Sequence, residues 1–220
     1  MKHKKILFIS GFLFFALQSC VYSDYLFQKQ SSWVTEWLDA SACAPPCWEG
    51  ITPGETTLYQ ISKDTNKTRT KLDFDGPHAF SDGSFYFGWT YNENGNLYPA
   101  VQATTESNLD MTIGDLQFEF GLPGSYLSVN DIISHFGEPD YVGIDEDMAG
   151  CGAVIFYSDK RVWLRLERKK MGDNYIINKG TGLSRSYYLS ESKRDERLKS
   201  FYPFRNQLES WNGYGEYQCK

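Results

Sequence analysis

Few side chains in this chain of 220 residues have the types and spacing that catalysis requires. Asp131 precedes His135 by four residues, and a carboxylate so placed can orient a histidine as a general base. We favour the simpler interpretation, a surface contact between residues i and i+4, because no G-x-S-x-G turn or H-E-x-x-H motif accompanies the pair. His78 follows Gly76-Pro77 and is interpreted as a solvated turn residue. The sequence therefore predicts no catalytic residue.

Acidic side chains gather at two places, Asp73/Asp75/Asp82 and 145–147. Calcium takes six to eight oxygen ligands from a defined loop, and neither cluster has such spacing. We expect solvated turns here, with no metal and no cofactor. Glycoside hydrolysis needs two carboxylates paired in space. Sequence does not reveal such pairs, so a hydrolase acting on cell-wall or glycan material stays as an alternative function.

The cysteines after residue 40 form an even set of Cys43, Cys47, Cys151 and Cys219. In an exported chain such a set indicates disulfides. The residues between the first two, Ala44-Pro45-Pro46, favour an extended backbone that separates Cys43 from Cys47. The predicted bridges therefore join the Cys43/Cys47 segment to Cys151 and Cys219. A zinc site is the alternative, although no paired C-x-x-C supports it.

Cys20 follows a basic start and the apolar run 6–17. The run is too short to span a bilayer as a helix, and it is typical of a secretory signal. With Leu17 three residues before the cysteine and Ser19 directly before it, the segment resembles a bacterial lipoprotein signal. The resemblance implies cleavage after residue 19 and lipid attachment (palmitate) at Cys20, with the acyl chains anchoring the protein. Gln18 departs from the pattern, so ordinary cleavage and an uncleaved anchor remain alternatives.

The charge balance excludes two classes of partner. The three lysines of the first 19 residues leave with the signal, so 22 basic residues become 19 against 28 acidic ones, a net charge of −9. An acidic surface argues against nucleic acid and against electrostatic binding to anionic lipid. We expect an extracytoplasmic protein held at the cell membrane or outer membrane by its lipid.

Six tryptophans could anchor a partner. Trp48 lies beside the cysteines and Trp163 lies inside an apolar strand, so both are predicted to be core. Trp33, Trp37 and Trp211 are the candidate binding-surface residues.

The elements that position these residues follow from periodicity and capping. Residues 20–32 are polar and predict a tether, and 33–38 predict a turn or two of helix. Capping-box spacing at Thr57/Gln60 and Ser128/Asp131 predicts two short helices. The second runs over 129–136 and stops at Gly137. Strands are expected at 84–91, 97–105, 111–120, 140–144, 152–157, 161–167 and 183–189.

Pro53-Gly54 and Pro123-Gly124 lie 70 residues apart, and each precedes a predicted helix and then strands. We predict one α+β domain over 33–220, an antiparallel β-meander sheet with two short helices. It would be a duplicated helix-plus-meander unit with pseudo-repeats 51–121 and 122–190. Coincidence is the alternative, because Pro-Gly is common before helices.

Two patches resemble the SmpA/OmlA (BamE-like) lipoprotein domain: Pro53-Gly54-x-Thr56 and Leu127-Ser128-Val129-x-Asp131-Ile132-Ile133-x-x-Phe136-Gly137-x-Pro139. In that family a short helix ending in a G-x-P step leads into a small antiparallel sheet, and duplicated versions look like the β-lactamase inhibitor protein fold. The segment 46–54 is similar to that of uncharacterised bacterial lipoproteins. The resemblance implies an exported, non-catalytic binding domain. We therefore expect a module that engages an envelope or cell-surface protein. A purely structural envelope protein is a third possibility.

Overall fold

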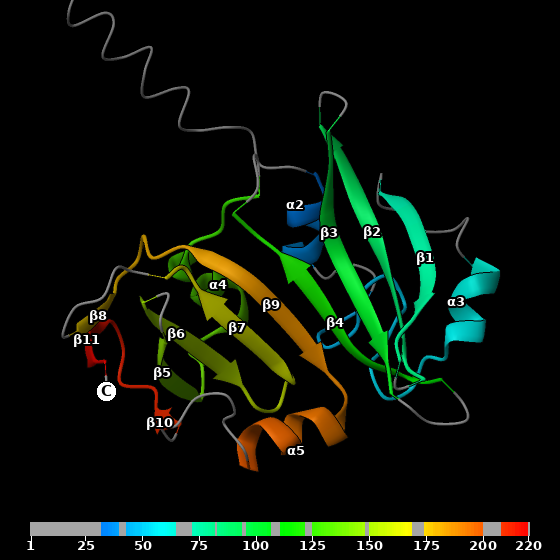
Figure 1. Cartoon of the computed structure of the whole chain (residues 1–220). Helices are drawn as coiled ribbons and strands as arrows, with labels where there is room; N and C mark the ends of the chain where they lie inside the picture. The colour runs from blue at the N-terminus through cyan, green and yellow to red at the C-terminus, as the bar shows by residue number, and fades with distance from the viewer. Residues whose placement is uncertain are drawn as a thin grey trace, which may run out of the picture.

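The computed structural model describes residues 32–39, 43–64, 72–81, 83–93, 96–106, 111–121, 125–147, 150–168, 174–199 and 208–219. Cys20, the predicted signal 1–19 and nearly all of the predicted tether lie outside these residues. Within these residues, nine strands form one antiparallel sheet, in the order β1-β2-β3-β4-β9-β7-β6-β5-β10 (Figure 1). Two further strands, β8 and β11, pair as a separate ribbon. The predicted α+β class with an antiparallel meander sheet is confirmed.

The helices are α2 (Ser32–Asp39), α3 (Leu58–Asp64), α4 (Val129–Phe136) and α5 (Glu191–Lys199). The strands are β1 (Asp73–Ala79), β2 (Phe85–Glu93), β3 (Asn96–Thr105), β4 (Ile113–Glu119), β5 (Tyr141–Asp147), β6 (Gly150–Tyr157), β7 (Val162–Leu166), β8 (Asn174–Ile177), β9 (Leu183–Leu189), β10 (Glu209–Ser210) and β11 (Gly215–Gln218).

The sheet consists of two similar halves. In the first, α3 precedes the meander β1-β2-β3-β4; in the second, α4 precedes β5-β6-β7-β9. The last strand of each half, β4 and β9, meet at the centre and pair antiparallel over Asp115–Glu119. This arrangement is the one that a duplicated helix-plus-meander unit produces.

The two halves also share their hydrogen bonds around the start of each helix. The Ile113 amide donates to the Thr56 carbonyl at 2.8 Å, and in the second half the Leu183 amide donates to the Leu127 carbonyl at 2.8 Å. Isolated bridges join Thr57 to Thr112 and Ser128 to Gly182. The equivalent residues are 70 or 71 positions apart, close to the spacing of the two Pro-Gly pairs in the sequence.

Both predicted capping boxes are present at these helix starts. The Thr57 amide donates to Gln60 Oε1 at 2.7 Å, and the Gln60 amide donates to Thr57 Oγ1 at 3.3 Å. In α4 the Ser128 amide donates to Asp131 Oδ2 at 2.9 Å, and the Asp131 amide donates to Ser128 Oγ at 3.3 Å. Each box satisfies amides that a helix start leaves without a partner.

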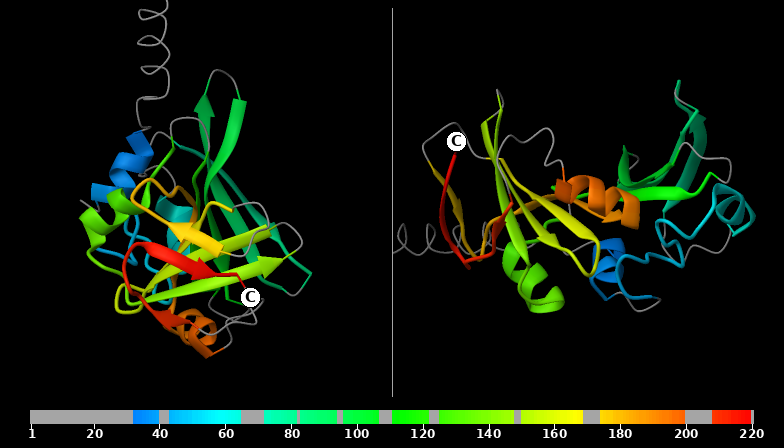
Figure 2. Two further views of the ribbon diagram at one scale, coloured as in Figure 1. Left: turned by 90° about the vertical axis from the view of Figure 1, so that its left-hand side faces the viewer. Right: turned by 90° about the horizontal axis from the view of Figure 1, so that it is seen from below.

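One face of the sheet forms the main core. Cross-strand partners on it make a continuous buried row from β2 to β5: Trp89, Val101, Phe118, Ser186, Leu164, Ile155 and Val142. The helices α2 and α4 lie together on this face (Figure 2). Trp37 of α2 has its ring centroid 5.4 Å from that of Phe136 in α4 and 5.8 Å from that of Phe118 in β4. Through these contacts α2 packs against both halves. We call the opposite side of the sheet the open face.

Strand β1 is an element that the sequence did not predict. Its residues Asp73–Ala79 include Gly-Pro, which is typical of a loop, but they form an edge strand whose register shifts between Asp75 and His78. At Gly76, with φ of 121°, an added Cβ would lie 2.6 Å from Phe87 Cβ. Only glycine allows the two strands to approach this closely.

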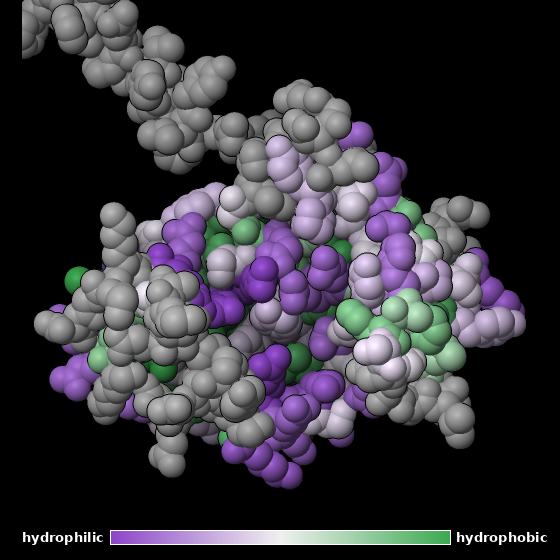
Figure 3. All heavy atoms as spheres, viewed as in Figure 1, coloured by the Kyte–Doolittle hydropathy of each residue, from purple (hydrophilic) through white to green (hydrophobic). Residues whose placement is uncertain are grey.

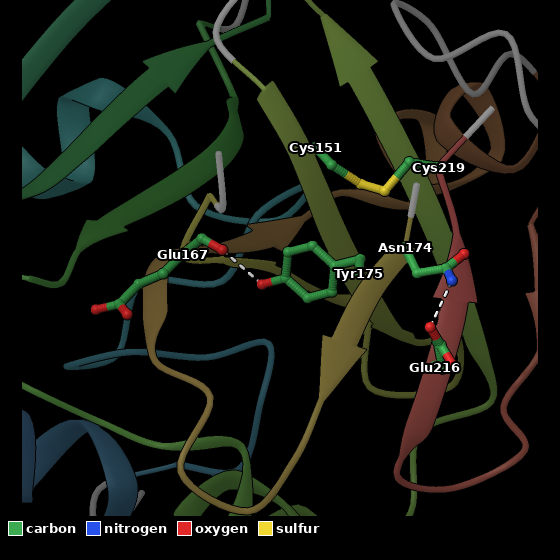
Figure 4. The surroundings of a disulfide bond; sticks show 6 residues. All are labelled: Cys151, Glu167, Asn174, Tyr175, Glu216 and Cys219. Atoms are coloured by element: carbon green, nitrogen blue, oxygen red, sulfur yellow. Dashed lines mark hydrogen bonds between the residues drawn. A yellow bond between two sulfur atoms is a disulfide. The ribbon is translucent and has the colours of Figure 1, made fainter. Parts of the chain in front are cut away.

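At the C-terminal end, a disulfide fixes the β8/β11 ribbon against β6 (Figure 4). Cys151 on β6 and Cys219 after β11 have Cα atoms 6.0 Å apart. The buried Tyr175 of β8 donates its hydroxyl to the backbone carbonyl of Glu167, and Asn174 donates to Glu216 across the ribbon. The chain end is thus bound to the second half of the sheet.

The predicted disulfide pairing is wrong. Cys43 bonds to Cys47, with Cα atoms 5.5 Å apart, and Cys151 bonds to Cys219. The prolines do not keep Cys43 and Cys47 apart, because the segment folds as a tight turn in which the Cys47 amide donates to the Ala44 carbonyl at 3.0 Å. All four cysteines are bridged as expected, which leaves none of them for a zinc site. Two disulfides indicate an oxidising, extracytoplasmic environment.

Candidate functional site

The open face of the sheet is the candidate site. Side chains alternate between the two faces of a strand, so the residue that adjoins a core-row residue along each strand points to the open face. These residues pair with one another across six strands and form a second row: Gln102, Gln117, Tyr187, Trp163, Phe156 and Tyr141. Figure 3, which shows the molecule from the same side as Figure 1, shows hydrophilic side chains gathered over the middle of this face.

The open face has an apolar part and a polar part. Over β6, β7 and β9, a small buried cluster contains Val154, Phe156, Trp163 and Leu189. The guanidinium of Arg197 in α5 lies 5.8 Å over the Trp163 ring, so α5 shields this apolar part. Over β3, β4 and the start of β9 the outward residues are polar and half-buried.

A charged row crosses the seam between the two halves. Glu119 on β4 lies opposite Arg185 on β9, with an Oε1–Nε distance of 2.8 Å, and Arg185 lies opposite Arg165 on β7. Burial lowers the pKa of Arg185, but the hydrogen bond and charge of Glu119 outweigh it and raise the pKa above its usual value. Because 42% of the Arg185 side chain is exposed, the pair can still contact a partner.

A polar cavity of about 620 Å³ opens at the α5 end of this face. The turn between β1 and β2 forms one wall, β3 and β4 form the floor, and the first turns of α5 form the other wall. Its lining residues are Phe80, Ser81, Ser84, Thr104, Thr105, Glu106, Gly114, Asp115, Ser192, Lys193 and Glu196.

Glu106 holds α5 in place at the rim of the cavity. Its Oε1 accepts hydrogen bonds from Ser190 Oγ at 2.8 Å and from Ser192 Oγ at 2.6 Å. A carboxylate at the start of a helix is stabilised by the helix dipole. Ser190 Oγ also accepts a hydrogen bond from the Lys193 amide at 3.3 Å. The same serine therefore connects the Glu106 carboxylate to the first turn of α5.

Asp115 lies on the cavity floor. Burial raises the pKa of its carboxyl, and the hydrogen bond from Thr104 Oγ1 and the charges of Lys193 and Arg197 only partly offset this. Sequence reasoning did not single out Glu106, Asp115 or Glu196. Each is an ordinary acidic residue in its own segment, and only the strand register and the position of α5 bring the three together.

The two predicted binding-surface tryptophans whose side chains the structure describes do not form a surface. Trp37 is only 1% exposed, so its prediction as a surface residue is wrong; the amphipathic α2 turns it into the core between α4 and the sheet. Trp211 is half-buried, stacks on Tyr217 and donates its indole N–H to Glu138. It therefore helps to attach the C-terminal segment, a role that no sequence pattern indicated. The side chain of Trp33 lies outside the described residues. Trp48 and Trp163 are buried, as predicted.

Asp131 and His135 do not form a catalytic pair. Asp131 is engaged in the capping box of Ser128, and the exposed His135 packs its ring against Phe136 at 5.0 Å. His78 is exposed, accompanied by Asp75 at 3.2 Å and stacked on Tyr86.

Neither acidic cluster from the sequence yields a described metal site. Asp73 and Asp75 are exposed on β1, while Asp82 and the side chains of 145–147 lie outside the described residues. Within the parts of the chain that the structure covers, no group of three His, Cys, Asp or Glu side chains could hold a metal ion.

Comparison of the chain with protein-family models, with characterised proteins and with solved structures finds no match. Among the described helices, none has the length and apolar character needed to cross a bilayer.

Proposed function

We propose that this protein is a lipid-anchored, extracytoplasmic binding module that engages an envelope or cell-surface protein without catalysis. The polar part of the open face would be the contact surface. This placement is the observation that carries the proposal: α2 and α4 cover one face of the sheet, while the part of the other face beyond α5 presents Gln102, Gln117, Tyr187 and the Glu119–Arg185 pair side by side.

Support for the anchor comes from two independent features. Leu17, Ser19 and Cys20 follow a short basic and apolar leader that resembles a lipoprotein signal. The two disulfides match the oxidising side of a membrane. The two helix-plus-meander halves are in keeping with the resemblance to the SmpA/OmlA domain and its duplicated versions.

The rigidity of the open face favours protein binding. Its residues stand on paired strands rather than on loops, and register fixes their spacing. Tyr and Arg are common in protein interfaces because each offers a large contact area with a polar end. A partner would meet a preformed surface, which lowers the entropy lost on binding.

Metabolic labelling with palmitate tests the anchor. The wild-type chain should incorporate the label, and Cys20→Ala should not, because the substitution removes the thiol that accepts the lipid. Equal labelling of both proteins contradicts lipidation at Cys20.

Photo-crosslinking in the native envelope tests the contact surface. A photoreactive residue at Gln117 on the open face should crosslink to a discrete partner. The matched control replaces Ser134, an exposed residue on α4 at the opposite side of the sheet. Crosslinks from Ser134 with none from Gln117 would place the contact on the helical side and overturn the proposal.

A secreted hydrolase acting on glycans is the second candidate function. The observation that favours it is the gathering of Glu106, Asp115 and Glu196 around one cavity, since glycoside hydrolysis uses a carboxylic acid of raised pKa beside a second carboxylate. If it is correct, purified protein should cleave cell-wall glycan and Asp115→Asn should abolish cleavage. Unchanged cleavage by Asp115→Asn would remove this candidate.

A further inference from the structure

The cavity beside α5 has one aromatic wall. Phe80 lines it and is 45% exposed, so its ring is accessible from the cavity. The Phe80 ring is held in place by Tyr86, whose ring centroid is 4.9 Å away, and Tyr86 stacks in turn on His78 at 4.9 Å. The turn behind Phe80 is closed by its own amide, which donates to the Ser84 carbonyl at 2.8 Å. A flat apolar surface is thus fixed at the rim.

The other walls are polar and rich in hydrogen-bond acceptors. Three carboxylates, from Glu106, Asp115 and Glu196, face the cavity with the hydroxyls of serine and threonine side chains. Hydroxyl protons already engage two of the carboxylates: Ser192 donates to Glu106 and Thr104 donates to Asp115. An ionised carboxylate accepts hydrogen bonds at about four sites. Walls of this chemistry favour a ligand that brings hydrogen-bond donors.

Gly114 widens the floor between these walls. It is buried on β4, and an added Cβ would lie 3.0 Å from the Glu106 side chain. Its lack of a side chain leaves room between the aromatic rim and α5. A cavity of about 620 Å³ is within the range of small-ligand sites, about 300–1,000 Å³.

The charges of the described lining residues disfavour acidic ligands. Of these residues three are acidic and one, Lys193, is basic; Lys193 Nζ lies 3.2 Å from Glu196 Oε2. The excess of negative charge repels carboxylates, sulfates and phosphates, and it tolerates neutral or cationic groups.

From these features we propose that the cavity is a saccharide-binding site for a neutral or amino-bearing sugar unit. A pyranose ring has an apolar face of C–H groups, which suits the exposed Phe80 ring, and a rim of hydroxyls that donate to the carboxylates. The cavity lies at the α5 end of the open face, and its described lining does not include Gln102, Gln117, Tyr187 or the Glu119–Arg185 pair. Saccharide binding here requires neither a protein partner nor bond cleavage, so its failure is distinguishable from failure of either function proposed above.

Titration of the purified protein with three disaccharides tests the proposal, with binding followed by NMR or calorimetry at about 1–10 mM. The glucosamine dimer should bind most tightly, cellobiose more weakly, and a disaccharide carrying glucuronate should not bind. Absence of saturable binding by both the glucosamine dimer and cellobiose overturns the proposal, as does equal binding of the glucuronate sugar.

Two variants locate the site. Phe80→Ala should weaken binding about three- to tenfold through loss of ring contact, whereas Tyr59→Ala, at an aromatic residue of α3 that is 65% exposed and does not line the cavity, should leave it unchanged. Glu196→Gln should reduce the preference for the glucosamine dimer over cellobiose, and Glu191→Gln on the same helix should not. Binding that survives Phe80→Ala at full strength rejects the cavity as the site. The sugar-binding results for the Phe80 and Glu196 variants do not depend on whether photo-crosslinking finds a protein partner.

Discussion

Asp115 carries its carboxyl at a half-buried position on the sheet. Thr104 is its neighbour across the β3–β4 pair and donates a hydrogen bond to it. That bond favours the charged form, while burial favours the neutral form and outweighs it. The same position that makes Asp115 useful to a ligand therefore makes it sensitive to pH.

Replacing Asp115 with asparagine should reveal the cost of burying this charge. The pKa of Asp115 in the folded protein is raised above 3.8, so its contribution to stability is present below pH 3.8 and is lost as pH rises through the folded pKa. The amide of the variant cannot ionise. The free energy of unfolding of Asp115→Asn, relative to wild type, should therefore increase from about pH 3 to about pH 7 in urea titrations.

A second variant tests the cause of that shift. Thr104→Val removes a hydrogen bond that lowers the pKa of Asp115, so its stability should fall more steeply with rising pH than that of wild type. If the free energy of unfolding of Asp115→Asn relative to wild type stays constant or decreases over the same pH range, the raised pKa of Asp115 is contradicted.

The two helix caps form a matched pair at equivalent positions. Ser128→Ala should lower the free energy of unfolding by about 1 kcal/mol, because it removes the buried hydroxyl that engages Asp131 in α4. Thr57→Ala should cost less, since the corresponding hydrogen bonds of α3 are exposed to water. Urea unfolding of both variants provides the measurement, and a larger loss for Thr57→Ala would count against the comparison.

At the scale of elements, the sequence predicted those helices and strands whose signals lie within their own residues. Capping spacing located α3 and α4, and strand signals located β2, β3, β4, β5, β6, β7 and β9. β1 was missed because its Gly-Pro step is typical of a loop, and its strand conformation depends on the partner β2. The short strands β8 and β11 depend on each other and on a disulfide. Neither segment has a pattern of its own.

The two disulfides should differ in their contribution to stability. In the chain-entropy model, the stabilisation grows with the length of the closed loop. Cys151–Cys219 closes 68 residues and Cys43–Cys47 closes 4. Replacing both cysteines of the long loop by serine should cost about 4 kcal/mol, and of the short loop about 2 kcal/mol.

Urea unfolding of the two double variants under non-reducing conditions gives this comparison. Loss of Cys151–Cys219 should also speed amide exchange in β11, because the bridge holds that strand near β6. A greater loss of stability from the Cys43/Cys47 variant would reverse the expected order.

At the scale of the molecule, the candidate site arises from register between segments far apart in the chain. Glu119 and Arg185 are 66 positions apart, and Ser192 is 86 positions from Glu106. Sequence indicated an acidic, disulfide-bonded α+β domain with repeated helix-plus-strand units. It could not indicate which acidic residues share a cavity, because that depends on how β9 enters the sheet between β4 and β7.

The central seam also makes the two halves depend on each other. Strand β4 of the first half pairs with β9 of the second, and Trp37 of α2 packs on Phe118 of the first half and on Phe136 and Tyr188 of the second. A fragment of residues 32–121 would expose this side of β4 and remove the two ring contacts with the second half. Its length is enough for independent folding, so any failure to fold would come from loss of the seam.

We therefore expect fragment 32–121 to lack a cooperative unfolding transition and to give poorly dispersed NMR spectra. Mixing it with fragment 122–220 should restore dispersed signals, because the pairing of β4 with β9 and the contacts of Trp37 can then form between the two chains. The full-length protein is the control. A monomeric fragment 32–121 that unfolds cooperatively on its own would mean that each half is a separate folding unit, and that the seam joins two domains rather than completing one.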